Sequence, residues 1–313
     1  MTDTTASSTP STWRRNPERG SPALLRVMAW LSLRCGRRAV FPLLHLVALY
    51  YFLFAPRSRR HMRSYLRRAL AREPGALDRY RLILCFATTI LDRLFLLAGR
   101  HDMFEISLEG ETLIRETAAA GGGAFLFGAH MGSFEVLRAL GDRQPGLQVA
   151  MAMYEDNARK LNAVLAATKP RHPPEIIALG HLDAMLKIRE RLDHGALIGV
   201  LADRTLGHEA SIPVSFLGAA AQLPLGPMRV AALLRRRVLF MLGLYRGRRH
   251  YRIVFEPLAD FTATATGERA AAVEVAVARY GRLLERHCRT DPYNWFNFFD
   301  FWSAPAGGPT TRS

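Results

Sequence analysis

The sequence is poor in lysine and cysteine and lacks several common functional motifs. Only three of its 43 basic residues are lysines, at positions 160, 169 and 187, so arginine carries almost all of the formal charge of +16. Its three cysteines are widely spaced, which excludes a disulfide scaffold and provides no zinc-ligand pair, and we expect no metal site. The chain has no Gly-Lys-Ser/Thr loop, no dinucleotide-binding fingerprint and no Gly-x-Ser-x-Gly motif, which argues against nucleotide-binding enzymes and serine hydrolases.

The excess positive charge is compatible with nucleic acid, an anionic membrane or an acidic soluble partner. The near absence of lysine argues against nucleic acid, as does the lack of any helix-turn-helix, zinc-finger or aromatic-basic RNA signature. Arginine-rich segments at residues 34–38 and 57–68 bracket an apolar run at residues 39–54. This placement indicates binding to anionic membrane lipids and no nucleic-acid partner.

The apolar run at residues 39–54 is too short to span a bilayer unaided. Its 16 residues fall below the roughly 20 that a membrane-crossing helix requires. Arginines on both sides favour a helix that lies in the cytoplasmic leaflet, with the guanidinium groups among the lipid headgroups. A buried core helix, or a single span extended by residues 23–33, are the alternatives.

The composition is that of a globular protein, with 49% hydrophobic and 22% charged residues. A length of 313 residues fits one large domain or two small ones. We predict a disordered leader at residues 1–20, a helical membrane-associating region at 21–75, a main domain at 76–302 and a flexible tail at 303–313.

Beyond residue 121 the sequence alternates short apolar runs with amphipathic helical stretches. Such alternation predicts an α/β fold with a mostly parallel central sheet flanked by helices. The expected strands are residues 124–128, 147–153, 176–179, 196–202, 238–244 and 251–255. The expected helices are residues 134–140, 158–166, 181–192, 227–236 and 268–287.

An aromatic segment, residues 291–302, follows the last predicted helix. We expect it to be packed core, with Asn294 and Asn297 satisfying buried backbone groups; membrane-interface or acyl-channel aromatics are the alternative. In either case the segment belongs to the main domain.

The stretch Gly121–Leu140 carries the residues best suited to chemistry. His130 stands at the carboxyl end of a predicted strand, where open α/β sheets bind ligands. Glu135 lies in the first turn of the next predicted helix, which Ser133 can cap. From there the Glu135 carboxylate could accept a hydrogen bond from one imidazole nitrogen of His130 and raise the basicity of the other.

The spacing of His130 and Glu135 is uninformative by itself. With ten histidines and 27 acidic residues in 313, about one such pair is expected by chance. Its value comes from the strand, the Gly-Ser turn and the helix around it. A histidine that is merely part of the core is the alternative.

The run His130-Met-Gly-Ser-Phe-Glu135, after a glycine-led strand, resembles the His-x4-Asp/Glu motif of the lysophospholipid acyltransferase superfamily. The closest branch is the bacterial lipid A lauroyl/myristoyl transferases, and the resemblance runs from the apolar N-terminal helix to the aromatic segment. A later family block is similar to Ala202-Asp203-Arg204 and Ile212–Gly218.

This chain has Ala-Asp-Arg-Thr where typical lipid A enzymes have an Asp-Gln-Asp-like sequence. It also lacks the Glu-Gly-Thr-Arg block, which argues against glycerol-3-phosphate as acceptor. Its tail is similar to a divergent branch linked with aryl-polyene and related lipids.

The resemblance implies a glycerolipid acyltransferase-like fold and an enzyme that moves an acyl chain from a thioester to a hydroxyl of a lipid or glycolipid. It implies that His130 is the general base and Glu135 holds it, with no bound cofactor and acyl carrier protein or coenzyme A carrying the donor. Developing oxyanion charge would be met by backbone N–H groups after His130 or by a nearby arginine. The candidate substrate-binding residues are Gly132, Ser133, Arg159, Asp203 and Arg204.

The expected location is the cytoplasmic face of the inner membrane, with peripheral attachment or a single N-terminal span. Two alternative functions remain at this point. A non-catalytic basic membrane-binding protein would bind lipid without transferring acyl groups. A serine hydrolase or esterase would react with a fluorophosphonate probe.

Overall fold

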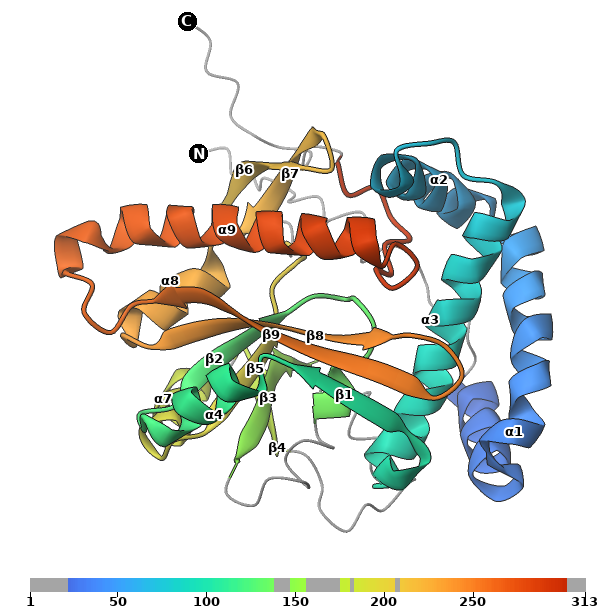
Figure 1. Cartoon of the computed structure of the whole chain (residues 1–313), viewed down its shortest axis with the longest axis horizontal. Helices are drawn as coiled ribbons and strands as arrows, with labels where there is room; N and C mark the ends of the chain where they lie inside the picture. The colour runs from blue at the N-terminus through green and yellow to red at the C-terminus, as the bar shows by residue number, and fades with distance from the viewer. Residues whose placement is uncertain (1–21, 138–146, 156–174, 181–182, 206–208, 303–313) are drawn as a thin grey trace, which may run out of the picture.

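The computed structural model describes residues 22–137, 147–155, 175–180, 183–205 and 209–302. At its centre is a seven-stranded sheet in the order β1-β9-β8-β2-β5-β3-β4 (Figure 1). Strands β8, β2, β5, β3 and β4 are parallel, while β9 is antiparallel to β8 and parallel to β1. The predicted α/β fold with a mostly parallel sheet is confirmed. The strands are β1 (Glu105–Glu109), β2 (Ala124–Gly128), β3 (Val149–Tyr154), β4 (Glu175–Leu179), β5 (Leu197–Leu201), β8 (Arg237–Tyr245) and β9 (His250–Asp260).

Strand β2 is the central strand that positions the candidate site. All five of its residues are buried, and β5 and β8 pair with it on either side. A strand buried on both faces reads as an unbroken apolar run, which is why its bounds were predictable. Strand β1, at the edge of the sheet, was missed because its five residues include only two apolar ones and none that is buried.

The two faces of the sheet are covered by different helices. Phe125 and Phe127 of β2 pack in one core cluster with α7, α8 and α9, and Leu126 packs in a second with α3 and α4. The helices are α3 (Ala76–Leu97), α4 (Glu111–Ala119), α7 (Ala184–Asp193), α8 (Gly226–Leu233) and α9 (Arg269–Thr290). Short 3₁₀ turns are η1 (His101–Met103), η2 (Phe134–Val136) and η3 (Thr266–Glu268).

Three helix predictions match α7, α8 and α9 with small shifts at their ends. The predicted helix at 158–166 lies outside the described residues. The predicted helix at 134–140 starts with the 3₁₀ turn η2 instead of an α-helical turn; Leu137 is α-helical, and residues 138–140 lie outside the described residues. This change redirects the residues that follow His130.

A separate two-stranded hairpin packs against α9. Strands β6 (Ser211–Phe216) and β7 (Ala219–Pro224) are joined by Leu217 and Gly218, whose φ values are 51° and 77°. Positive φ at both positions suits a tight hairpin turn. The turn ends the block Ile212–Gly218 that resembles the family, and Glu285 of α9 accepts a 2.7 Å hydrogen bond from the Leu217 N–H.

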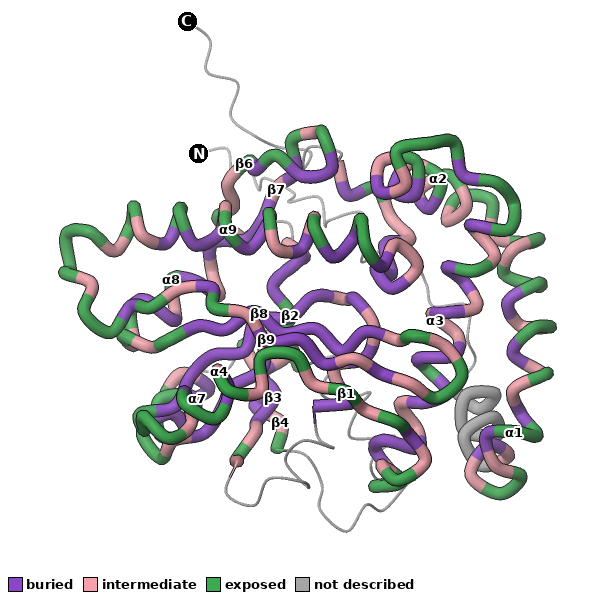
Figure 2. Tube along the Cα trace, in the orientation of Figure 1, coloured by how far each residue is buried: buried purple, intermediate pink, exposed green. Residues whose placement is uncertain are grey.

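Helices α1 (Pro22–Phe54) and α2 (Pro56–Leu70) pack against α3. Helix α1 is kinked at Gly36, where φ is 81°. By length and composition residues 31–54 are able to cross a membrane. One side of this stretch, including Val40 and Leu44, is nevertheless buried in the protein, and the other side is exposed (Figure 2).

A buried ion pair fastens α1 to the rest of the domain. Arg37 Nε lies 2.5 Å from Asp92 Oδ1, and the Tyr251 hydroxyl donates a 2.9 Å hydrogen bond to the same carboxylate. These three side chains come from α1, α3 and β9. Helix α1 is therefore an integral part of the fold.

The aromatic segment after α9 is packed core, as predicted. Trp295, Phe296 and Phe301 are buried. The Asn294 side chain accepts the Tyr245 N–H at 2.8 Å and donates to the Tyr245 carbonyl at 3.1 Å, as expected. The expectation for Asn297 is wrong: its buried side-chain amide has no hydrogen bond to any described residue.

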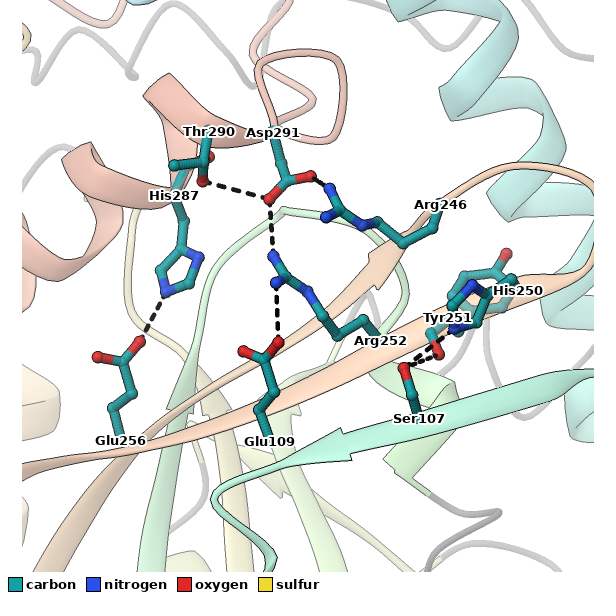
Figure 3. A network of polar contacts seen from close by, with 10 residues as sticks. All are labelled: Ser107, Glu109, Arg246, His250, Tyr251, Arg252, Glu256, His287, Thr290 and Asp291. Carbon is teal, nitrogen blue, oxygen red and sulfur yellow. Dashed lines mark hydrogen bonds and ion pairs between the residues drawn. The ribbon is translucent and has the colours of Figure 1, made fainter.

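Figure 3 shows how the start of this segment is held. Asp291 stands at the end of α9, and its carboxylate lies between two arginines of the β8–β9 hairpin. It pairs with Arg246, and it accepts a 3.0 Å hydrogen bond from Arg252, which also binds Glu109 of β1. The segment thus leaves α9 at a point tied to the sheet.

Candidate active site

His130 and Asp203 meet because their strands are neighbours. Strands β2 and β5 are parallel, with Gly128 opposite Leu201. Each strand is followed by one alanine and then by His130 or Asp203, so both side chains emerge at the same carboxyl edge of the sheet. Nδ1 of His130 lies 2.7 Å from Oδ1 of Asp203, and the His130 backbone N–H donates to Oδ2 at 3.1 Å.

Asp203 is fully buried yet ionised. Burial alone would raise the pKa of its carboxyl group. Three neighbours outweigh this effect: His130 through its charge and its hydrogen bond, Arg204 through its charge, and Trp295 through its N–H. The pKa of Asp203 therefore lies well below its usual range. Because an ionised carboxylate only accepts hydrogen bonds, Nδ1 of His130 carries the proton and Nε2 carries the lone pair.

His130 is neutral at physiological pH and accessible to a substrate. Burial and the positive charges of Arg204 and Arg93 lower its pKa, and Asp203 offsets this only in part. The side chain retains 32% of its exposure. Among the described residues none is hydrogen-bonded to Nε2, and a neutral, accessible imidazole of this kind can remove a proton from a hydroxyl group.

The predicted hydrogen bond between Glu135 and His130 is wrong. The Glu135 carboxylate instead lies 2.6 Å from Arg93 Nε of α3, and it accepts a 3.0 Å hydrogen bond from the Ser133 hydroxyl. The chain after His130 forms two isolated β-bridges and then a 3₁₀ turn. That path directs Glu135 toward α3, so Asp203 occupies the place expected for Glu135.

Gly132 and Ser133 shape the turn after His130. Gly132 has φ of 69°, and a Cβ atom there would lie 1.9 Å from the Gly243 carbonyl oxygen. Its N–H donates to the Asn294 carbonyl at 2.8 Å, and the Ser133 N–H donates to the Gly243 carbonyl at 2.8 Å. Both N–H groups are thus engaged within the protein. The Ser133 side chain does not cap the 3₁₀ turn as predicted, because it binds Glu135.

The aromatic segment supplies contacts that sequence reasoning missed. Trp295 Nε1 donates to Asp203 Oδ2 at 3.1 Å, and the Phe296 N–H donates to the His130 carbonyl at 2.9 Å. Met131 and Trp295 form an antiparallel bridge. The only sequence signal was a polar-aromatic run near the end of the chain. Arg93 was missed as well, because nothing in the sequence distinguishes it from the other two arginines of α3.

Arg204 lies beside the His130–Asp203 pair. Its Nη2 donates a 3.0 Å hydrogen bond to the Phe296 carbonyl, and its guanidinium carbon lies 5.1 Å from the centre of the Phe299 ring. Burial lowers the pKa of Arg204, and the charge of Asp203 opposes that shift. The last candidate, Arg159, lies outside the described residues. Within the described part of the chain, no group of three potential metal ligands occurs.

The geometry suits general-base chemistry on a hydroxyl group. The site lies at the carboxyl ends of β2 and β5, beside the C-terminal aromatic segment. Residues 22–303 match the family model described as bacterial lipid A biosynthesis acyltransferase. The chain belongs to this family. The match runs from α1 to the aromatic segment, so it includes every site residue described above. No curated protein matches the sequence.

Membership of the lipid A acyltransferase family establishes the class of reaction. The protein is an acyltransferase that acts in lipid biosynthesis, with an acyl donor and a lipid acceptor. This confirms the resemblance drawn from the His-x4-Glu run. The serine-hydrolase and non-catalytic interpretations are set aside.

Proposed function

We propose that the protein transfers a fatty acyl chain from an acyl thioester to a hydroxyl of a lipid or glycolipid, with His130 as general base and Asp203 orienting it. The observation that carries the proposal is the 2.7 Å contact between His130 Nδ1 and Asp203 Oδ1. An acid on one imidazole nitrogen fixes the tautomer that leaves the other nitrogen basic.

The proposed reaction needs no covalent enzyme intermediate. Nε2 of His130 takes the proton from the acceptor hydroxyl as its oxygen attacks the thioester carbonyl carbon. The C–O bond forms, the tetrahedral intermediate collapses with loss of the C–S bond, and the imidazolium returns the proton to the leaving thiolate. Asp203 stabilises the imidazolium while it exists.

Arginine is the better candidate for stabilising the oxyanion. The N–H groups of Met131, Gly132 and Ser133 are all bonded to carbonyl oxygens of the protein. Arg204 and Arg93 both lower the pKa of His130 through their charge, which supports their placement near the reacting atoms. We assign them to the oxyanion or to a phosphate of the donor or acceptor.

In this proposal Glu135 positions the side chain of Arg93. The 2.6 Å contact between Glu135 Oε1 and Arg93 Nε supports that role. An ionised Glu135 would hold the guanidinium at the edge of the site and leave its remaining N–H groups for an anion. The acid of the family motif then contributes to catalysis through substrate binding.

Acyl carrier protein is the proposed donor protein. Exposed arginines follow the outer face of α9 and continue onto α2 at Arg60, Arg63 and Arg67. The Arg289 side chain donates to the Arg68 carbonyl, which joins the two helices. A positively charged surface of this kind suits an acidic carrier. The α9 arginines are Arg279, Arg282, Arg286 and Arg289.

The outer face of α1 is proposed to lie on the cytoplasmic leaflet of the inner membrane. Its exposed apolar residues recur at helical spacing, and Arg57 and Arg60 are exposed in the adjoining helix. The opposite face is fastened to α3 through Arg37 and Asp92, which favours peripheral attachment over a free span. The apolar residues are Leu46, Leu49, Tyr50, Leu53 and Phe54, with exposures of 45–64%.

The test compares lipids by mass spectrometry in a strain that lacks the gene and in strains complemented with wild-type protein or with His130→Ala. We expect one class of lipid to lose an acyl chain in the deletion strain and to regain it only with wild-type protein. The missing chain identifies donor length and acceptor together. Restoration by a folded His130→Ala protein would overturn the catalytic assignment.

A further inference from the structure

The indole of Trp295 contacts the carboxylate that orients His130. Its Nε1–H donates to Asp203 Oδ2 at 3.1 Å, and Trp295 itself is 1% exposed. We propose that Trp295 is a positioning residue for acyl transfer: its N–H locks the rotation of the Asp203 carboxylate so that Oδ1 faces Nδ1 of His130. This inference rests on the proposed function of His130 and Asp203.

The two oxygens of Asp203 have different partners. Oδ1 binds the imidazole at 2.7 Å, and Oδ2 receives both the Trp295 indole and the His130 backbone N–H at 3.1 Å each. Asp203 is 0% exposed, so bulk water cannot replace a lost donor. Rotation of the carboxylate would break all three hydrogen bonds at once.

Trp295 is itself held firmly. Its ring centre lies 4.8 Å from that of Tyr65, 4.8 Å from that of Phe301 and 5.3 Å from that of Phe216. Its backbone forms a bridge with Met131, the residue after His130. The same short ladder therefore sets the positions of the imidazole and of the indole.

The indole N–H also helps to keep Asp203 charged. Burial acts to raise the pKa of that carboxyl group, and the Trp295 hydrogen bond is one of the interactions that lower it. A carboxylate that loses a hydrogen-bond donor becomes more basic and attracts its remaining cationic partner more strongly. The imidazolium of His130 would then be stabilised more strongly, and its pKa would rise.

Trp302 provides a matched control within the same aromatic cluster. Its ring contacts Trp295 and Phe216, and its Nε1–H donates to the Phe216 carbonyl at 3.2 Å. Trp302→Phe removes an indole N–H and the same ring volume without touching Asp203. Because Trp302 is less buried than Trp295, thermal unfolding of each variant measures its structural cost, and a loss of kcat confined to Trp295→Phe reports the contact with Asp203.

The experiment measures acyl transfer and thermal unfolding of the full-length protein carrying Trp295→Phe or Trp302→Phe. For Trp295→Phe we expect kcat to fall by about 10- to 100-fold, with KM for both substrates nearly unchanged. The midpoint of the acidic limb of the pH–kcat profile should move to higher pH. Trp302→Phe should keep both kcat and that midpoint.

A double-mutant cycle separates positioning from packing. Once Asp203→Asn has removed the carboxylate, adding Trp295→Phe should lower kcat little further. Two results would overturn the inference. One is an equal loss of kcat in Trp295→Phe and Trp302→Phe; the other is a loss of kcat in Trp295→Phe that adds fully to the loss in Asp203→Asn. If Trp295→Phe does not fold, benzothienylalanine at position 295 keeps the bicyclic ring, removes the N–H and gives the same test.

The outcomes distinguish this inference from the proposed function. If His130→Ala and Asp203→Asn remain fully active, the proposed function is wrong. If both lose activity and Trp295→Phe behaves like Trp302→Phe, the catalytic assignment holds and only the role of Trp295 is wrong.

Discussion

Nδ1 of His130 lies 2.7 Å from Oδ1 of Asp203, a residue 73 positions further along the chain. The pair joins two adjacent parallel strands, and no residue that the structure describes is hydrogen-bonded to Nε2 of His130. Glu135, five residues from His130, has Arg93 as its partner instead. The acid in the local motif and the acid that touches the histidine are thus different residues.

Asp203→Asn should lower kcat by about 10²- to 10⁴-fold with little change in KM, because the neutral amide no longer secures the tautomer or stabilises the imidazolium. Glu135→Gln is the matched comparison and should mainly raise KM, because it releases Arg93. Steady-state kinetics with an acyl carrier protein thioester would measure both. A kcat loss in Glu135→Gln as large as that in His130→Ala would restore Glu135 as the direct partner of His130.

The pH profile of kcat/KM should have its acidic midpoint below 6.5, the ordinary pKa of histidine. Burial and the charge of Arg204 lower the pKa of His130, so the imidazole stays neutral to a lower pH. Activity requires that neutral form and should therefore rise with pH through the lowered pKa, then level off toward neutrality. Arg204→Gln should shift the midpoint upward, because one source of the lowered pKa is removed. A midpoint above 6.5 would contradict the described environment.

Gly132→Ala should destabilise the protein by at least about 2 kcal/mol or prevent folding. The new Cβ would meet the Gly243 carbonyl oxygen at 1.9 Å, and φ at this position is 69°. Gly226→Ala is the control, since Gly226 lies at ordinary φ and a Cβ added there would have no heavy atom within 4 Å. Denaturant unfolding of both variants measures the difference. Equal stability of the two would show that the turn after His130 is not as tight as described.

Arg37→Ala should destabilise the fold by about 3–5 kcal/mol, because it leaves the buried Asp92 carboxylate without its cation. The exposed pair Arg63–Glu73, with side chains 60% and 57% accessible, is the comparison. Arg63→Ala should change the unfolding free energy by about 1 kcal/mol or less. If the two variants unfold at the same denaturant concentration, α1 is not secured by this ion pair.

Replacing Leu46, Leu49 and Leu53 together with serine should weaken binding to anionic vesicles by at least about tenfold, because three exposed apolar side chains are lost from the outer face of α1. Leu186→Ser, which removes an even more exposed leucine from α7, should leave binding unchanged. Vesicle flotation at low and high salt would measure both the apolar and the arginine contributions. Undiminished binding of the triple variant would place the membrane surface elsewhere.

Several elements follow from local sequence alone. An unbroken apolar run such as that of β2 is typical of a strand covered on both faces in a parallel sheet. The bounds of β2 and the place of His130 at its carboxyl end were therefore predictable. The amphipathic period of α9 was sufficient to locate that helix. The apolar run at residues 39–54 was likewise sufficient to predict a helix there, and that part of α1 does expose apolar side chains.

The partner of His130 depends on strand order, which no local pattern encodes. Asp203 reaches His130 because β5 pairs with β2 in parallel register, and Trp295 reaches Asp203 because the segment after α9 returns to bridge Met131. Glu135 is turned away because Gly132 packs against Gly243 on β8, the strand on the other side of β2. Local sequence thus placed a histidine at the edge of a sheet, while the packing of strands remote in sequence selected the acid and the indole that complete its site.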